Sequence, residues 1–416
     1  MTTAAVQTGQ DRLPSYALFA AFLAAAGLPL YIHAPKFYVD QYGLSLGALG
    51  AVLFGLRLLD VVQDPLLGRL AEKLRRHRAL AVTVAVLVLA MSIVGLFAIN
   101  PPLAPLLWFA LNLVLVFSAF SFLTINFYAQ GVTKAGQLGE FGHLRVARWR
   151  ETGALLGVCV AAVAPVMLAF ILDWPFAGFA ASFVGLAFAA WVAMRAEWGA
   201  EHTTQSVGFG PVLRDPVARR LLFIAFVNAA PVAITSTLVL FFVESRLEAP
   251  GLEGPLLLLF FLSAAAAAPV WGRLAEAIGT KQALILGMAL SIAAFGGALS
   301  LGAGDWLLFS LICIASGAAL GADMTLLPAL FAARMAVISP NAAEGFGLWS
   351  FVSKFTLAFA AILLLPALEA EGFRAGPDNA AEALGLLTLF YAGVPCVLKA
   401  VAISVLATTN LRENCE

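Results

Sequence analysis

The sequence has few charged residues. Only 12% of its 416 residues are charged, and 62% are hydrophobic, whereas soluble globular domains carry about 25% charge. This composition excludes a soluble monomer. Basic and acidic residues are balanced at 24 each, so the basic surplus that nucleic-acid binding needs is absent as well.

The sequence also lacks the clusters that build disulfide frameworks and zinc sites. Its four cysteines, Cys159, Cys313, Cys396 and Cys415, include no CxxC pair and no Cys/His ligand spacing. It has no nucleophile and base pair and no phosphate-binding loop, so it predicts neither an enzyme nor a bound cofactor. The apolar stretch after Asp11 is too long for a signal-peptide core and predicts a retained membrane span.

Long apolar stretches dominate the rest of the chain. A bilayer core of about 30 Å requires roughly 20 apolar residues per helix. The sequence therefore predicts an all-α integral membrane protein with twelve transmembrane helices, at 13–38, 46–70, 79–99, 103–129, 143–171, 176–195, 217–244, 254–277, 282–303, 306–333, 346–368 and 383–408.

The loop charges predict the orientation of these spans. With a cytoplasmic N-terminus, seventeen Lys and Arg residues lie on the inner side, and only Arg246 and Arg374 lie on the outer side. Because positive charge is retained in the cytoplasm, both termini are expected inside a multi-pass protein of the cell inner membrane.

The longest polar connection, 196–216, divides the chain into two sets of six spans, 1–195 and 217–416. The same five residues, Gly-Arg-Leu-Ala-Glu, occur at Gly68–Glu72 after the second span and again at Gly272–Glu276 after the eighth. A chance match in Ala- and Leu-rich sequence is the alternative to duplication. Two duplicated six-helix bundles are the architecture of major facilitator transporters, whose substrate site lies between the halves near the midplane.

The second span carries three charged residues, Arg57, Asp60 and Asp64. A charge at the centre of a membrane helix costs about 2.5 to 3.5 kcal/mol on insertion scales, and these three lie on one helical face. One interpretation is an internal ion pair between Arg57 and one of the two acids, but the other acid would then remain unneutralised. Pro65 also leaves a backbone carbonyl without its helical donor. With the amide of Gln63, these oxygens form a predicted site for a small cation such as sodium.

Two more charged residues lie far inside predicted spans. Lys354, in the eleventh span, is expected to face the interior and to neutralise the surplus carboxylate of the second span. A purely structural bridge between the halves is the alternative. Asp323, in the tenth span near Thr325 and Pro328, is either a second site acid or part of a hydrogen-bonded helix kink.

Weaker signals come from isolated residues. Arg150 belongs either to the positive inner rim or lies two turns inside a fifth helix that starts near Phe141. Asn126 either binds the substrate or serves as a polar group at the end of its helix. Trp349 either stacks against a sugar or is an aromatic side chain packed between helices. Lys399 is expected to lie close enough to the inner end of its span to snorkel.

Several segments carry a family resemblance. The pattern Arg-x-x-Asp-x-x-x-Asp-Pro-x-x-Gly at 57–68 resembles the glycoside-pentoside-hexuronide:cation symporter family, which includes the melibiose carriers. The similarity extends over both halves, through Phe37–Ser45, Arg148–Glu151, Gly321–Pro328 and Glu344–Lys354.

The resemblance implies roles for individual residues. Asp60 and Asp64 match the cation-site carboxylates of the family, and Gln63 occupies an Asn position. Arg150 matches the arginine near the sugar, and Lys354 matches the lysine close to the cation site.

The sequence also departs from the pattern of this family. One sugar-holding acid falls at Ala24 and the other at Asn126, and an acidic motif after the tenth span is replaced by Ala333–Val337. These departures argue against melibiose-like glycosides, and lysophospholipid symporters of the same branch leave an amphipathic substrate open.

The sequence thus predicts a monomeric secondary active transporter whose partners are a small-molecule substrate and the lipid bilayer. Sodium or protons would drive uptake of a small polar organic solute, such as a sugar or glycoside, as the two halves rock around the loaded site. The alternatives are a lipid, amphipath or drug transporter of the same fold and a non-transporting membrane assembly factor.

Overall fold

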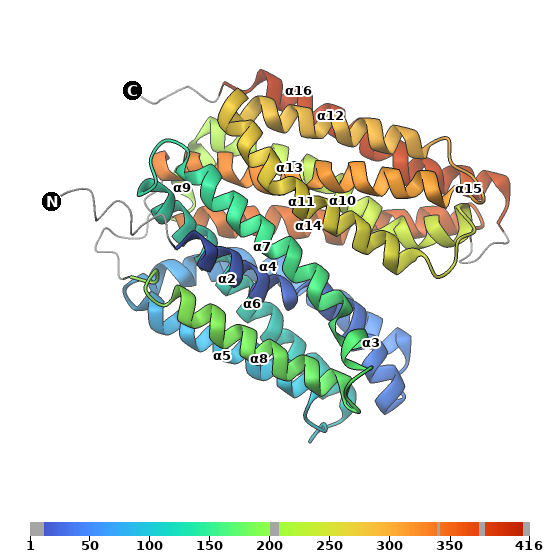
Figure 1. The fold of residues 1–416 in the computed structure, drawn as a ribbon, viewed down its shortest axis with the longest axis horizontal. Coiled ribbons are helices and arrows are strands. Elements are labelled where there is room, and N and C mark those ends of the chain that lie inside the picture. Colours follow the sequence, from blue (N-terminus) through green and yellow to red (C-terminus); the bar gives the residue numbers. More distant parts are fainter. Residues whose placement is uncertain (1–11, 200–207, 339–341, 374–378, 411–416) are drawn as a thin grey trace. The chain divides into compact units, whose positions relative to one another are not determined.

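The computed structural model describes residues 12–199, 208–338, 342–373 and 379–410, and within them it leaves undescribed the side chains of 28, 29, 31, 32, 36, 46, 57, 61, 357–362 and 365. Every regular element in this part of the chain is a helix. The chain divides into two compact units (Figure 1). Unit 1 comprises 1–211 and 335–351, and unit 2 comprises 212–334 and 352–416.

Unit 1 is built mainly from the first helices of the chain. They are α2 (Leu13–Ala25), α3 (Leu28–Tyr42), α4 (Leu46–Lys73), the 3-10 helix η1 (Arg75–His77), α5 (Arg78–Phe97), α6 (Pro105–Gly136), α7 (Gly142–Leu168) and α8 (Pro175–Met194). The short helix α9 (Gly210–Arg214) lies where the chain passes from unit 1 to unit 2.

Unit 2 contains the later helices, two of which it shares with unit 1. They are α10 (Pro216–Phe241), η2 (Phe242–Arg246), α11 (Glu253–Ile278), α12 (Thr280–Ala298), α13 (Trp306–Ile338), α14 (Ala342–Ala370), α15 (Ala381–Thr388), η3 (Leu389–Gly393) and α16 (Val394–Thr408). The last turn of α13 and the first ten residues of α14 belong to unit 1. Both η2 and η3 are π-helical turns.

Nine helices of the described residues are long and apolar enough to cross a membrane. The other predicted spans coincide with α2 and α3, with α4 and with α14. Side chains of α3, α4 and α14 lie outside the description, and α2 has only 13 residues. The all-α membrane fold is therefore confirmed, and the count of twelve stays a prediction, as do the predicted domain limits. The prediction of a single helix over 13–38 is wrong, because the chain breaks at Ala26–Gly27 and Pro29 cannot donate a hydrogen bond back to α2.

Glycines bring the backbones of α2 and α7 together in unit 1. A Cβ atom at Gly153 would lie 2.1 Å from the carbonyl oxygen of Ala17, and one at Gly157 would lie 2.5 Å from that of Ala21. Small residues four apart permit this close crossing of membrane helices. The crossing fixes the position of the α7 turn that carries Arg150.

The same device joins α11 and α13 in unit 2. A Cβ atom at Gly317 would lie 2.2 Å from the carbonyl oxygen of Phe260, and one at Gly321 would lie 2.7 Å from that of Ala264. In the same unit α16 packs against α10 and α12 (Figure 1). These contacts hold Asp323 of α13 and Lys399 of α16 within one bundle.

Candidate functional site

The two acids of α4 are buried beside an amide and serine hydroxyls. Asp60 is 6% exposed and Asp64 is fully buried. The Gln63 amide donates to Oδ1 of Asp60 over 2.6 Å, and the Ser121 hydroxyl of α6 approaches the same oxygen at 3.5 Å. The hydroxyl of Ser350 donates to Oδ2 of Asp64. This cluster presents carboxylate, amide and hydroxyl oxygens in one place.

Ser350 reaches Asp64 because α4 and the start of α14 touch through glycines. A Cβ atom at Gly347 would lie 3.1 Å from the backbone oxygen of Asp64 and 3.2 Å from the Cα atom of Gly68. A larger side chain at either glycine would push the helices apart. Gly347 therefore positions the turn that carries Ser350.

The sequence analysis did not identify the hydroxyl groups of this cluster. Ser118 donates to the Gln63 amide oxygen over 2.9 Å, and Ser121 lies one turn further along α6. Two serines three residues apart in an apolar helix were an available signal, since that spacing puts both on one face. Ser350 gave no comparable signal, because only the fold brings it to α4.

A second polar cluster in unit 1 surrounds Arg150, which lies inside α7. Its guanidinium carbon is 3.6 Å from the centre of the Tyr128 ring, and its Nε donates to Glu151 over 2.6 Å. The Tyr128 hydroxyl donates to the same carboxylate over 3.0 Å. In the described structure Nη2 of Arg150 is buried without a hydrogen-bond partner. Arg150 thus lies inside the bundle rather than on its rim and keeps one donor available.

The structure locates the remaining predicted residues of α4, α6 and α14. Asn126 is buried in α6 and donates to the carbonyl oxygen of Phe122 over 2.8 Å. Trp349 is half-buried in the unit 1 part of α14, and Lys354 is half-buried in the unit 2 part. The side chain of Arg57 lies outside the described residues, so its pairing with the acids stays a prediction. The pairing of Lys354 with the acids of α4 also stays a prediction.

Asp323 belongs to a separate cluster in unit 2. The Lys399 ammonium group donates to Oδ2 of Asp323, and to the amide oxygen of Asn228 over 2.6 Å. The expectation that Lys399 snorkels toward the inner surface is wrong, because it is 2% exposed and held by these two partners. Its burial inside the bundle follows from the carboxylate opposite it, which only the fold reveals.

The chemistry of the α4 cluster suits a hard cation. Carboxylate, amide and hydroxyl oxygens are ligands that such cations prefer. Among the described residues, no three His, Cys, Asp or Glu side chains form a group that could hold a metal ion. The α4 cluster also offers two carboxylates that can take up a proton.

Long apolar helices in two units, with buried charge clusters inside them, define a multi-pass membrane protein. The chain belongs to the major facilitator superfamily (MFS): the family described as MFS/sugar transport protein matches residues 15–413. No curated protein matches the chain.

Solved structures share this fold at low sequence identity. A crystal structure of a bacterial homologue of the iron transporter ferroportin, in an outward-facing state, has a TM-score of 0.67 and 14% identity, covering 94% of this chain and 99% of that one. A second structure of such a homologue, with soaked iron, has a TM-score of 0.68 and 13% identity, covering 95% and 99%. These similarities support the MFS fold and carry no information about substrate.

Proposed function

We propose that the protein is a cation-coupled secondary transporter in which Asp60 and Asp64 bind sodium or a proton. One observation carries the proposal: two carboxylates four residues apart on α4, one 6% exposed and the other fully buried, lie beside an amide and a serine hydroxyl that add further oxygen ligands. The resemblance to glycoside:cation symporters supports the same assignment. The solute is a small polar organic molecule.

The physical basis of coupling is the cost of buried charge. Removing a carboxylate from water costs several kcal/mol, even after relaxation, unless a cation or a proton compensates it. A bound cation therefore stabilises whichever conformation holds both acids close together. If that conformation also binds solute, each ligand raises the affinity for the other by the same factor.

Arg150 is the proposed solute-binding residue of unit 1. Its buried Nη2 group can donate to a solute oxygen, while Tyr128 and Glu151 hold the rest of its side chain. A planar, permanently charged donor fork suits a solute rich in oxygen acceptors. Trp349, Asn126 and Asp323 stay predictions for the same role.

The test is the cation dependence of thermal stability in lipid nanodiscs, with sodium exchanged for choline at constant ionic strength. A ligand that binds only the folded protein stabilises it by RT ln(1 + [L]/Kd), so the melting temperature should rise with sodium. Asp60→Asn and Asp64→Asn should abolish this rise, whereas the exposed Asp173→Asn should retain it. A pH series with the same variants tests the proton in the same way.

The outcomes separate the rival functions. Cation or proton responses in folded Asp60→Asn and Asp64→Asn equal to those of the wild type would overturn the site. A non-transporting assembly factor would show no cation response and no solute uptake in proteoliposomes.

The proposed role of Lys354 rests on the charges in the sequence. With two acids and Arg57 on α4, a lysine of α14 would compete with the cation and help the empty carrier to reset. Lys354→Ala, Asp60→Asn and the double variant form a mutant cycle for cation affinity. Non-additive effects are expected, and strictly additive ones would end this assignment.

A further inference from the structure

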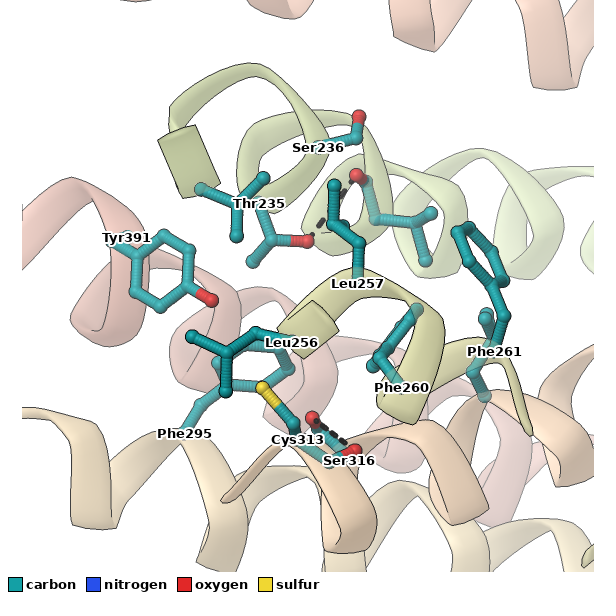
Figure 2. Close-up of a pocket in the computed structure, with 13 residues that line it drawn as sticks. Thr235, Ser236, Leu256, Leu257, Phe260, Phe261, Phe295, Cys313, Ser316 and Tyr391 are labelled. Atoms are coloured by element: carbon teal, nitrogen blue, oxygen red, sulfur yellow. Dashed lines mark hydrogen bonds between the residues drawn. The ribbon is translucent and has the colours of Figure 1, made fainter. Parts of the chain in front are cut away.

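Unit 2 contains a cavity that the cation site does not use. It encloses about 550 Å³ of space free of protein atoms, its open side included. Ligand pockets are mostly apolar and have a small number of polar groups. Figure 2 shows its lining, with Tyr391 and Phe261 on opposite sides and Leu256, Leu257 and Phe260 between them. The lining comes from α10, α11, α12, α13 and η3.

The cavity adjoins a smaller one that two charged residues help to line. This space of about 260 Å³, its open side included, shares Thr235, Phe260 and Ser316 with the larger cavity and is also lined by Asp323 and Lys399. An apolar chamber therefore lies beside a buried ion pair. Tyr391 belongs to the π-helical turn η3, and such turns are frequent at functional sites.

The ion pair has hydrogen-bonding capacity to spare. Asp323 is 7% exposed, and its Oδ1 atom is buried without a hydrogen-bond partner in the described structure. The ammonium group of Lys399 has three N–H bonds and donates to Asp323 and Asn228, which leaves one. A buried unpartnered carboxylate oxygen costs free energy, and a ligand that donates to it would recover that cost.

The cavity hydroxyls act as further acceptors. Thr235 donates to the carbonyl oxygen of Pro231 over 2.9 Å, and Ser316 donates to that of Ile312 over 2.6 Å. Since each hydroxyl has given its only proton to its own helix, only its oxygen lone pairs remain for a ligand. A group with several donors, such as a set of hydroxyls, fits these acceptors.

Charge decides between head groups. Asp323 and Lys399 already neutralise each other, so a charged head would leave one uncompensated charge in a buried place, which is costly. A neutral head that both donates and accepts meets Oδ1 of Asp323 and the remaining N–H of Lys399 without that cost.

We infer that unit 2 binds a neutral amphipathic solute, with its apolar body in the larger cavity and its hydroxyl-bearing head beside Asp323 and Lys399. The inference rests on the proposed transport function and changes the proposed solute from a small polar molecule to an amphipathic one. It makes Asp323 a head-group acceptor and Thr235 part of the wall that the solute contacts.

The test uses hexyl β-glucoside as the probe, with glucose, hexyltrimethylammonium and hexyl sulfate for comparison. Binding is measured by isothermal titration calorimetry on the full chain in nanodiscs, with empty nanodiscs subtracted. We expect hexyl glucoside to bind at least tenfold more tightly than each of the other three. Equal affinity for the charged probes would overturn the neutral head group, and equal affinity for glucose would overturn the apolar chamber.

Two variants locate the probe. Thr235→Phe fills the space shared by both cavities and should weaken binding of hexyl glucoside at least tenfold. Thr237→Phe, the same substitution outside the lining, should keep wild-type affinity. Asp323→Asn should weaken binding about tenfold, as expected for loss of a charged hydrogen-bond acceptor. Wild-type affinity in Thr235→Phe would overturn the inference even if Asp323→Asn failed to fold.

The result can be separated from that of the cation site. The calorimetry is run in choline and in sodium, and also on Asp64→Asn. If the proposed coupling fails, no variant shows a cation response, yet probe binding still depends on Thr235. If the cavity inference fails, the cation response is retained and the affinity for the probe is unchanged in Thr235→Phe.

Discussion

The buried acids of the two units differ in what surrounds them. In unit 1, Asp60 and Asp64 receive hydrogen bonds from an amide and from serine hydroxyls. In unit 2, Asp323 receives its hydrogen bond from an ammonium group, that of Lys399. In unit 1 the amide and the hydroxyls bring further polar oxygens beside the two carboxylates, whereas in unit 2 the ammonium group of Lys399 neutralises the charge of Asp323. The unit 1 cluster therefore offers several oxygen ligands to a cation, and the unit 2 pair suits a neutral group.

The largest expected effect comes from breaking the pair in unit 2. Lys399→Met leaves the Asp323 carboxylate buried without its cation, which should cost about 3 to 5 kcal/mol of stability. Adding Asp323→Leu should recover most of the loss, since apolar replacement of a whole buried pair is often neutral. Melting temperatures in nanodiscs measure both. A double variant no more stable than Lys399→Met would show that charge is not the reason.

A smaller effect should follow from separating α4 and α14 in unit 1. Gly347→Val places side-chain atoms against the Asp64 backbone oxygen, 3.1 Å from where a Cβ atom would lie, and overpacking costs about 1 to 3 kcal/mol. The sodium response should weaken with it, because Ser350 moves away from Asp64. Gly385→Val is the matched control, since a Cβ atom at Gly385 meets nothing within 4 Å. An unchanged sodium response in Gly347→Val would contradict the positioning role.

A further variant removes one hydroxyl donor from the cluster of unit 1. Ser350→Ala deletes the hydroxyl that donates to Asp64, and a hydrogen bond to a charged group is worth about 1.5 kcal/mol or more. We expect sodium affinity to fall several-fold and the melting temperature without sodium to fall as well, because the bond is present in the structure without sodium. The exposed Ser182→Ala, whose hydroxyl donates only to the backbone of Gly178, is the control. Loss of stability without loss of sodium affinity would make Ser350 purely structural.

The smallest expected effect concerns a carboxylate at the start of α10 that is both paired and a helix cap. Asp215 accepts from the backbone amide of Ala218 over 2.6 Å and is paired with Arg334 of α13. Burial raises the pKa of Asp215, but these hydrogen bonds and the Arg334 charge lower it more, so the pKa lies below its ordinary value of 3.8. Asn caps a helix about as well as Asp, so Asp215→Asn keeps the cap and removes the charge that pairs with Arg334.

The sign of the pH effect follows from this lowered pKa. The contribution of Asp215 is fully present above its unfolded pKa and is lost as pH falls through the folded one. The melting temperature of the wild type should therefore exceed that of Asp215→Asn at pH 7, and the gap should close below about pH 4. Asp173→Asn should show no such gap. A gap that stays constant to pH 3 would contradict the lowered pKa.

Much of the fold followed from the sequence because helix formation in a membrane is a local matter. The apolar stretch at 103–129 overlaps α6, and the stretch at 282–303 overlaps α12, because a bilayer requires each span to satisfy its own backbone hydrogen bonds. The break between α2 and α3 was missed because hydropathy alone does not report Gly27 and Pro29 as a helix boundary.

The sequence by itself determined that Asp60, Asp64 and Lys399 lie in apolar helices of a membrane protein, since apolar residues flank them on both sides. Only the tertiary structure decided their partners. Ser350 meets Asp64 across 286 residues of chain, and Lys399 meets Asp323 across 76. The physical reason is that a helix is specified by neighbours within a few turns, whereas a buried charge is compensated by whichever group the packing of distant helices brings to it.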